Sequence, residues 1–490
     1  MSSRRIAAIL LAAFLLTSFG CGKALSQGPY QATGIKIGEV TDSSAIVWTR
    51  LTQRPERVGS EAPMPKVSYR DPATGNLSER RGSGRPDRVP VVEFPDGSTI
   101  DTIEGAVPGA AGMVRVRYKT QDSSDWNTTN WHSVDPKRDY THHFKLTGLR
   151  PNARYQVLVE AGKGSASAVK GGFKTAPRAE ESERVVFTVS TGQAYPDQDA
   201  AGGGYKIYAA MLRLDPSFFV HTGDIIYYDR LAKSLPLARW HWSRMYSLPT
   251  NVEFHRQVAS YFIKDDHDTW MNDCWPGRKT KFMGDFTFEQ GLAVFPEQVP
   301  MGERTWRTFR WGKDLQIWLV EGRDYRSPNT MPDGPEKTIW GDKQKAWFKQ
   351  TVQQSDATFR ILISPTPVVG PDRTNKHDNH SNKNFKHEGD EIREFLSKQK
   401  NVYVICGDRH WQYVSVDKDT GVREYSCGPA SDKHAGGWSD DQRYPEHQYL
   451  KVIGGFLAVT VDRSQGAPTI AFRHYGVGGD VLNEDVFAAR

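Results

Sequence analysis

The chain has 490 residues, more than one hydrophobic core normally serves, so two or three domains are expected. The formal net charge is +6, but three of the basic residues lie in the first 26 positions, which hold no acid, so the remainder carries only +3. This weak excess indicates no nucleic-acid-binding surface, and no later apolar run approaches the length of a membrane span.

The first 26 residues are typical of an export signal. Arg4 and Arg5 precede the apolar run IAAILLAAFLL, and Ala24 and Ser26 give a small-x-small cleavage pattern. The arginine pair resembles a twin-arginine signal, which would carry a folded, metal-loaded protein across the membrane. We therefore predict a signal peptide over 1–26 and an exported protein, periplasmic or extracellular, with the twin-arginine route as one of the possible routes.

The four cysteines do not form a disulfide framework. Cys21 could be a lipid-attachment site that anchors the N-terminus, although Ser18 stands where that motif usually has leucine. The other three, Cys274, Cys406 and Cys427, are odd in number and widely spaced. We expect them to be thiols of the core.

Residues 34 to 177 are predicted to form a β-sandwich. Short alternating runs such as GIKIGEV, SAIVWTRL and GMVRVRYKT are separated by turn signals. The segment LTGLRPNARYQVLVEA resembles the corner between two strands of fibronectin type III-like domains, in which the hydroxyl of Tyr155 would anchor the corner. The predicted fibronectin-like domain spans 27–178, and the stretch 59–112, rich in Gly, Pro, Arg and Asp, is interpreted as a long, partly irregular insertion.

After the charged linker PRAEESER the pattern changes to that of an α/β domain, predicted over 184–480. Apolar runs such as RVVFTVS, PSFFVHTGD, VASYFIKDD and NVYVICGDRHW alternate with helical stretches. Each of these runs ends in polar residues. An α/β enzyme presents its site in this way, with functional side chains at the carboxyl ends of rigid strands.

Three strand ends carry residues that can bind metal ions. They are Asp224 and Tyr227 in HTGDIIYYD; Asp265, Asp266, His267 and Asp268 in KDDHDTW; and Asp408 and His410 in CGDRHW. Hydrolysis of a phosphate ester by hydroxide requires two cations that share one carboxylate, and Asp224 is the best candidate for it. A phenolate at Tyr227 suits a trivalent ion such as iron(III) better than zinc.

In this order, and behind the opening segment GIKIGEVTDSSAIVWTRL, the three motifs resemble the alkaline phosphatase D (PhoD-like) branch of the calcineurin-like metallophosphoesterases. The resemblance implies an αββα sandwich of two sheets flanked by helices. It also implies a dinuclear site of iron(III) with calcium or another divalent ion such as zinc, magnesium or manganese. The implied roles are a bridge for Asp224, the iron for Tyr227 and His410, the second ion for Asp266 and Asp408, and catalysis for His267.

The chain departs from that family pattern in two places. Gly192, in STGQAY, stands where the family usually has a cysteine that binds iron. Water or a nearby acid, Asp197 or Asp199, would then complete the metal site. Otherwise the metal site is weakened or catalytically altered. Ser364 stands where purple acid phosphatase relatives have a ligand histidine. His380, in the loop beyond it, is either a second-metal ligand or phosphate contact, or an incidental histidine of a surface loop.

Further positions are candidates for substrate contact or for support of the ligands. Arg373 could neutralise a bound phosphate, Asn272 could hold phosphate or orient the catalytic histidine, and Asp265 lies next to a proposed ligand. Lys264 is expected to pair with the acids that follow it. Arg409 is expected to point away from the metals because it alternates with two ligands.

The favoured hypothesis is an exported metallophosphoesterase that hydrolyses phosphate monoesters or diesters through a hydroxide bridging two metal ions. One alternative keeps the fold and directs it to a phospholipid headgroup or to a teichoic-acid-like cell-wall polymer. Another is a non-catalytic surface binding protein on a decayed scaffold, suggested by Gly192, although a decayed site has no reason to keep all six proposed site residues. No sequence feature fixes the oligomeric state.

Overall fold

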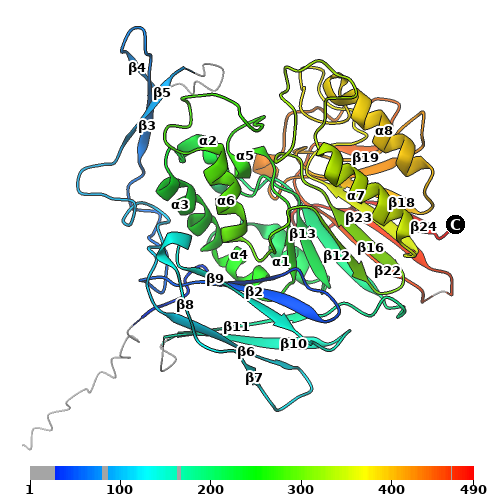
Figure 1. Ribbon diagram of the computed structural model, residues 1–490, viewed down its shortest axis with the longest axis horizontal. Helices are drawn as coiled ribbons and strands as arrows, with labels where there is room; N and C mark the ends of the chain where they lie inside the picture. The colour runs from blue at the N-terminus through cyan, green and yellow to red at the C-terminus, as the bar shows by residue number, and fades with distance from the viewer. Residues whose placement is uncertain (1–27, 80–86, 163–166, 465) are drawn as a thin grey trace, which may run out of the picture.

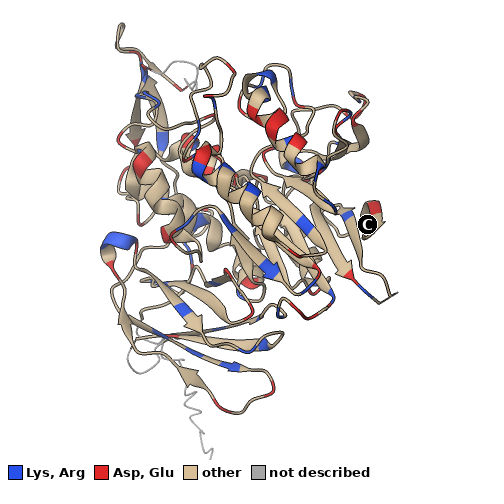
Figure 2. Cartoon of the chain, turned by 45° about the vertical axis from the view of Figure 1, so that its right-hand side comes forward, with Lys and Arg blue, Asp and Glu red and all other residues tan. Residues whose placement is uncertain are grey.

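The computed structural model describes residues 28–79, 87–162, 167–464 and 466–490. The predicted signal peptide and Cys21 lie outside these residues. Within the described ranges no helix combines the length and apolar character needed to cross a membrane. In the view of Figure 2, acidic and basic residues are interspersed along the described chain.

Two sheets of the C-terminal part pack face to face (Figure 1). One has the order β24-β23-β22-β12-β13-β14 and the other β15-β16-β17-β18-β20-β19-β21. The strands of the first are β12 (Val185–Ser190), β13 (Phe218–His221), β14 (Ser260–Phe262), β22 (Phe456–Asp462), β23 (Thr469–Tyr475) and β24 (Val481–Ala488). Those of the second are β15 (Arg307–Trp311), β16 (Leu315–Leu319), β17 (Phe359–Ser364), β18 (Val402–Cys406), β19 (Gln412–Val416), β20 (Arg423–Cys427) and β21 (His447–Lys451).

Helices cover the outer face of each sheet. The first sheet carries α1 (Lys206–Leu212), α2 (Tyr228–Leu231), α3 (Leu235–Tyr246), α4 (Pro249–His255), α5 (Asp266–Thr269) and α6 (Phe288–Gln298). The second carries α7 (Gly341–Gln354) and α8 (Lys386–Ser397). Short 3-10 turns are η1 (Pro136–Arg138), η2 (Tyr195–Asp197), η3 (Lys383–Phe385) and η4 (Asp432–His434). The predicted αββα sandwich is confirmed.

The central strands are apolar on both faces because each face has its own core. Phe218 of β13 packs between the sheets, where its ring lies 4.7 Å from that of Trp311. Its neighbour Phe219 points to the helices and lies 5.1 Å from Phe254 of α4. Burial on both sides explains why the run SFFV reads as continuously hydrophobic rather than alternating.

The N-terminal part is rich in strands, as predicted, and one of its two layers is continuous with the first sheet of the C-terminal part. Its strands β1 (Ile35–Gly38), β2 (Ser44–Arg50) and β9 (Thr141–Thr147) extend the first sheet beyond β14, through Gly38 opposite Ser260. A Cβ at position 38 would lie 2.4 Å from the Ser260 carbonyl oxygen, so this junction requires glycine. The second layer holds β6 (Met113–Thr120), β7 (Asn127–Thr128), β8 (His132–Ser133), β10 (Arg154–Ala161) and β11 (Ser167–Lys174).

The stretch interpreted as an insertion is partly regular. It forms a three-stranded sheet of β3 (Lys66–Arg70), β4 (Leu77–Ser78) and β5 (Val89–Glu93), which projects from the body at the upper left of Figure 1. Beyond this sheet, Ile103 and Ala106 pack on Leu237 and Trp240 of α3. The insertion therefore attaches the N-terminal part to the helices of the C-terminal part.

The predicted tyrosine corner is present. The Tyr155 hydroxyl accepts a hydrogen bond from the backbone N–H of Arg150 at 2.8 Å, and the ring stacks on Phe173 with the centroids 5.3 Å apart. The bond fixes the turn that leads into β10 while the ring fills the core between the layers.

We expect Tyr155→Phe to lower the free energy of unfolding by about 1 kcal/mol, because it removes this hydrogen bond and leaves the ring packing intact. Chemical denaturation followed by circular dichroism measures the change. Tyr118→Phe is the control, since its hydroxyl makes no hydrogen bond among the described residues. Equal losses in the two variants would contradict an anchoring role for the Tyr155 hydroxyl.

Candidate functional site

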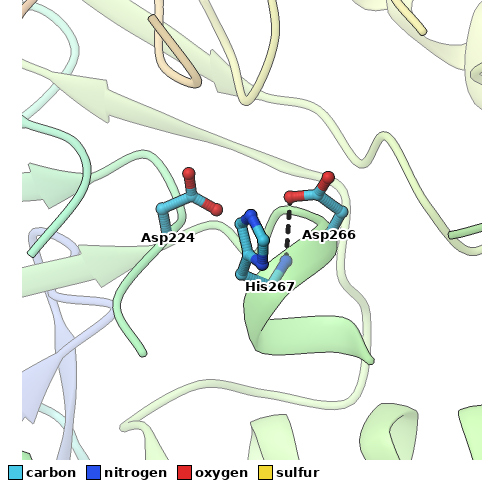
Figure 3. Close-up of side chains that lie close together, drawn as sticks. All are labelled: Asp224, Asp266 and His267. Atoms are coloured by element: carbon cyan, nitrogen blue, oxygen red, sulfur yellow. Dashed lines mark hydrogen bonds between the residues drawn. The ribbon is translucent and has the colours of Figure 1, made fainter. Parts of the chain in front are cut away.

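The three predicted strand ends meet at one edge of the two sheets. Asp224 follows β13, Asp265 and Asp266 follow β14, and Asp408 follows β18. Figure 3 shows Asp224 facing Asp266 and His267 across a short gap. Ligand atoms of Asp224, Asp266 and His267 lie within 4.8 Å of one another, and so do those of Asp224, Asp265 and Asp408. Asp224 belongs to both groups.

The backbone is forced into an uncommon conformation at two of these positions. Asp224 has φ +55° and Asp408 has φ +62°, the left-handed region that side chains other than glycine rarely adopt. Gly223 permits the close approach of the next loop, because a Cβ there would lie 2.6 Å from the Asp265 Cβ. The loops after these strands thus bring several carboxylates close to one another.

The carboxylates of Asp224 and Asp265 are buried and incompletely bonded. Asp224 is 1% exposed, and its Oδ1 has no hydrogen-bond partner among the described residues. Arg323 Nε donates to Asp265 Oδ1 at 2.7 Å, whereas Asp265 Oδ2 likewise has no partner there. Burial, together with the neighbouring charge of Asp266, raises the pKa of each to about 7. Free oxygens in this setting fit ligands of cations.

Tyr227 faces two histidines on the other side of Asp224. Its Oη lies 3.3 Å from His410 Nε2, 2.6 Å from His434 Nε2 and 3.4 Å from Asp224 Oδ2. Burial and the charge of Asp224 raise the pKa of the phenol well above its usual value. Burial and the charge of Arg409 lower the pKa of His410 to about 3. Burial and the neighbouring His410 lower the pKa of His434 to about 3 as well. The imidazoles are therefore neutral and able to bind a metal ion.

His267 has a partner that sequence analysis missed. Its Nδ1 lies 3.2 Å from Asp229 Oδ1, in the stretch HTGDIIYYD itself. Burial lowers the pKa of His267, but the carboxylates of Asp229, Asp266 and Asp224 outweigh it and raise the pKa well above its usual value. The imidazole is thus held in one orientation as a cation.

Asp268 is a structural residue of the site. Its side chain accepts hydrogen bonds from the backbone N–H groups of Ile225 at 3.1 Å and Asp265 at 3.2 Å. The second bond belongs to the capping box at the start of α5. Asp268 therefore links the loop that carries Asp224 to the loop that carries Asp265.

Three predicted positions behave differently from expectation. Lys264 pairs with Glu321 at 2.5 Å and Asp324 at 2.6 Å rather than with the acids that follow it. His380 is fully buried and its Nε2 lies 2.9 Å from Glu388, so it is not an incidental histidine of a surface loop. The error at His380 arose because its loop is polar in sequence but covered by α8 in the fold. Its role as a second-metal ligand or phosphate contact stays a prediction.

Arg409 was expected to point away from the ligands Asp408 and His410, with which it alternates in the chain, but it contacts one of them. Its buried guanidinium contacts the carboxylate of Asp408 and donates to Asp372 at 2.6 Å. Arg373 is partly exposed and lies over the Trp411 ring, 5.5 Å from its centroid. The backbone carbonyl of Asn272 accepts a hydrogen bond from Arg278 Nη1 at 2.9 Å. Neither Arg373 nor Asn272 has a contact here that tests its proposed role.

The two acids considered as replacements for the missing cysteine have other partners. Asp197 Oδ2 lies 2.8 Å from His434 Nδ1, and Asp199 Oδ1 accepts from the Lys206 backbone at the start of α1. His434 itself was missed. A signal was available, since β20 is parallel to β18 and the polar stretch SDKH follows it after Gly-Pro-Ala.

Comparisons with known proteins agree with this architecture. A family model described as PhoD-like phosphatase matches residues 187–449, and one described as the N-terminal domain of PhoD-like phosphatase matches 22–177. The chain belongs to the PhoD-like phosphatase family. Membership makes it a phosphoric ester hydrolase, as the motifs predicted.

Solved structures share the fold of this PhoD-like phosphatase at low sequence identity. A structure of PhoD is 16% identical, with a TM-score of 0.70, and the match covers 94% of this chain and 90% of the other. Purple acid phosphatase PPD1 from yellow lupin (Lupinus luteus) seeds is 14% identical, with a TM-score of 0.55 and coverage of 93% and 74%. No curated protein sequence gives a significant match.

We expect Lys264→Met to lower the free energy of unfolding of this PhoD-like phosphatase by about 3–5 kcal/mol. The change leaves Glu321, which is 1% exposed, without its buried cation. Thermal and denaturant unfolding measure the loss. Lys398→Met, which removes an exposed pair with Glu394, serves as the control and should cause no measurable change. An unaltered Lys264→Met protein would show that this buried pair is dispensable.

Proposed function

We propose that this PhoD-like phosphatase acts after export and hydrolyses phosphate esters with two cations held on either side of Asp224. The observation that carries the proposal is the central position of Asp224, which belongs to both groups of ligand atoms and lies 3.4 Å from Tyr227 Oη and 3.3 Å from His410 Nε2 through its Oδ2. A shared carboxylate is what two closely spaced cations require. The orphaned Asp224 Oδ1 supports the same assignment. Export is proposed from the sequence of residues 1–26.

The residues present fit two different ions. Tyr227 and His410 would hold one, and a phenolate favours iron(III) there. Asp266 and Asp408 would hold the other, where carboxylates favour calcium or another divalent ion, zinc, magnesium or manganese. When bound, the ions would lower the pKa of a water molecule and neutralise phosphoryl oxygens.

His267 is the proposed catalytic residue. Its contact with Asp229 and the surrounding carboxylates keep a proton on the ring. A fixed imidazolium can stabilise the charge that develops on the phosphoryl group or donate its proton to the leaving oxygen. Arg373 and Asn272 are proposed as substrate contacts, and Asp265 as a further carboxylate near the second ion. The site supports catalysis rather than a decayed scaffold, since all six proposed residues come together.

We expect Asp224→Asn to lower kcat at least a hundredfold, because neither ion would keep its shared anionic ligand. We also expect a visible tyrosinate-to-iron charge-transfer band that disappears in Tyr227→Phe. Metal analysis, absorption spectra and assays of a monoester and a diester measure these effects. Tyr228→Phe is the matched control, because that hydroxyl is buried against Trp242 at 2.5 Å.

Two outcomes would count against the assignments. A colourless protein with full activity would exclude iron(III) at Tyr227. Undiminished activity in both Asp224→Asn and His267→Ala would exclude this cluster as the active site.

A cavity beside Tyr227 favours esters with a sizeable organic group. It has a volume of about 250 Å³, and its lining is mostly apolar. Residues that line it include Met64, Tyr195, Ile226, Leu231, His241 and Met245. Because Tyr227 lines both the cavity and the metal cluster, an ester held at the cluster could place its alcohol part in the cavity. An apolar cavity suits a hydrocarbon or aromatic alcohol better than the polar repeat of a cell-wall polymer, so it supports the lipid-directed phosphodiesterase of the two alternatives.

We expect Leu231→Trp to fill part of this cavity and to lower kcat/KM for a diester with a large aromatic group about tenfold. Hydrolysis of a small alkyl monoester should be unchanged. Leu77→Trp, at an exposed position of β4, is the control. Steady-state kinetics with both substrates test the idea, and equal effects on the two esters would refute a role of the cavity in substrate choice.

A further inference from the structure

We infer that His434 is a metal ligand of this site and that it takes the space a side chain at position 192 would need. The inference rests on the proposed function, because it concerns the ion on the Tyr227 side. Nothing in the three sequence motifs points to His434, which belongs to η4, 24 residues beyond His410 in the chain.

Four polar atoms from different segments converge beside β13. Tyr227 Oη lies 2.6 Å from His434 Nε2 and 3.3 Å from His410 Nε2, and His410 Nε2 lies 3.3 Å from Asp224 Oδ2. The two imidazole rings are tilted against each other with centroids 4.2 Å apart. Two imidazoles, a phenol and a carboxylate directed at one point form a ligand set for a transition metal ion.

Asp197 fixes the orientation of His434. Its Oδ2 lies 2.8 Å from His434 Nδ1, and the two side chains are 24% and 10% exposed. An imidazole that donates Nδ1–H to a carboxylate presents the lone pair of Nε2 on the opposite side, here toward Tyr227 and His410. A carboxylate bonded to the outer nitrogen is the usual support of a metal-binding histidine. Asp197 is therefore a positioning residue and not itself a ligand.

A side chain at position 192 would need the space that the His434 and His410 rings occupy. A Cβ on Gly192 would lie 3.1 Å from His410 and 3.2 Å from His434, and any longer side chain would extend further among these rings. The φ of +43° at Gly192 also disfavours other residues. The glycine therefore leaves room for the second imidazole.

The turn that carries His434 is fastened to the Gly192 segment. The Ala430 N–H donates to the Gly192 carbonyl at 2.9 Å, and Thr191 forms a bridge with Pro429. Lys433 Nζ donates to the Gln198 carbonyl at 2.7 Å. These bonds hold η4 beside the cluster, as a rigid metal site requires.

Cobalt(II) titration of the metal-free protein tests the inference, with calorimetry and visible absorption as readouts. The wild-type chain should bind two ions. His434→Ala should weaken one of them at least a hundredfold and alter the visible spectrum, whereas Asp197→Asn should weaken it about tenfold. His447→Ala removes a similarly buried histidine that bonds the Tyr444 backbone, and it should bind both ions as the wild type does.

His434→Gln separates a ligand from a hydrogen-bond partner of Tyr227. Glutamine can keep a hydrogen bond to the phenol but is a poor ligand, so binding as weak as in His434→Ala supports the inference. Wild-type affinity in His434→Gln or His434→Ala overturns it. If the wild-type chain binds no ion and hydrolyses no ester, the proposed function falls as well. Two ions and activity in the wild type, with unchanged binding in every His434 variant, refute the role of His434 alone.

Discussion

The structure depends on the crowding of several carboxylates into a place with little water. Asp224, Asp265 and Asp266 are 1%, 0% and 3% exposed, and a buried carboxylate without a counter-charge is strongly unfavourable. Arg323 serves two of them, at 2.7 Å from Asp265 and 3.7 Å from Asp266. One oxygen each of Asp224 and Asp265 still has no partner in the described chain, and bound cations would complete the charge balance.

The scaffold holds these charges together against their repulsion. Parallel strands that are apolar on both faces end at the same edge, so each loop starts from a fixed position. Thr191 Oγ1 donates to the Gly223 carbonyl at 3.3 Å and accepts from the Asp408 N–H at 3.2 Å. Asp268 joins the same loop of Asp224 to the loop of Asp265 in a similar way. The left-handed backbone at Asp224 and Asp408 is maintained by these bonds and by the buried strands on either side.

The sequence predicted the fold and the residues that follow strand ends, because strand pattern and strand-end chemistry are local. Asp224 and Asp266 follow the apolar runs of two neighbouring parallel strands, β13 and β14, so strand pairing brings them together. Asp408 follows β18 of the other sheet and joins them because the two sheets pack face to face. The partners of Lys264 and His380 could not be read in this way. Each depends on which distant segment packs against it, Glu321 in one case and α8 in the other.

The same reason explains why Gly192 was noticed and His434 was not. A missing ligand is visible in a motif, but its replacement comes from a segment more than two hundred residues away. Asp197 was considered as a ligand because it is near Gly192 in sequence, and its actual partner is the imidazole. The joining of β1 to β14 through Gly38 was equally invisible, because one contact between two domains leaves no periodic pattern.

A histidine at 434 in place of a side chain at 192 would change the charge of the site as well as its shape. Burial and His410 keep the pKa of His434 at about 3, so it brings no charge. Asp224 and Tyr227 would then be the groups in the convergent set on that side that can carry a negative charge. Because burial raises the pKa of Tyr227, its phenol ionises only against a strongly charged ion. Binding of iron(III) and loss of the phenolic proton are therefore coupled, while the two imidazoles also suit zinc or iron(II). The charge of the ion at this position would therefore decide whether Tyr227 loses its proton.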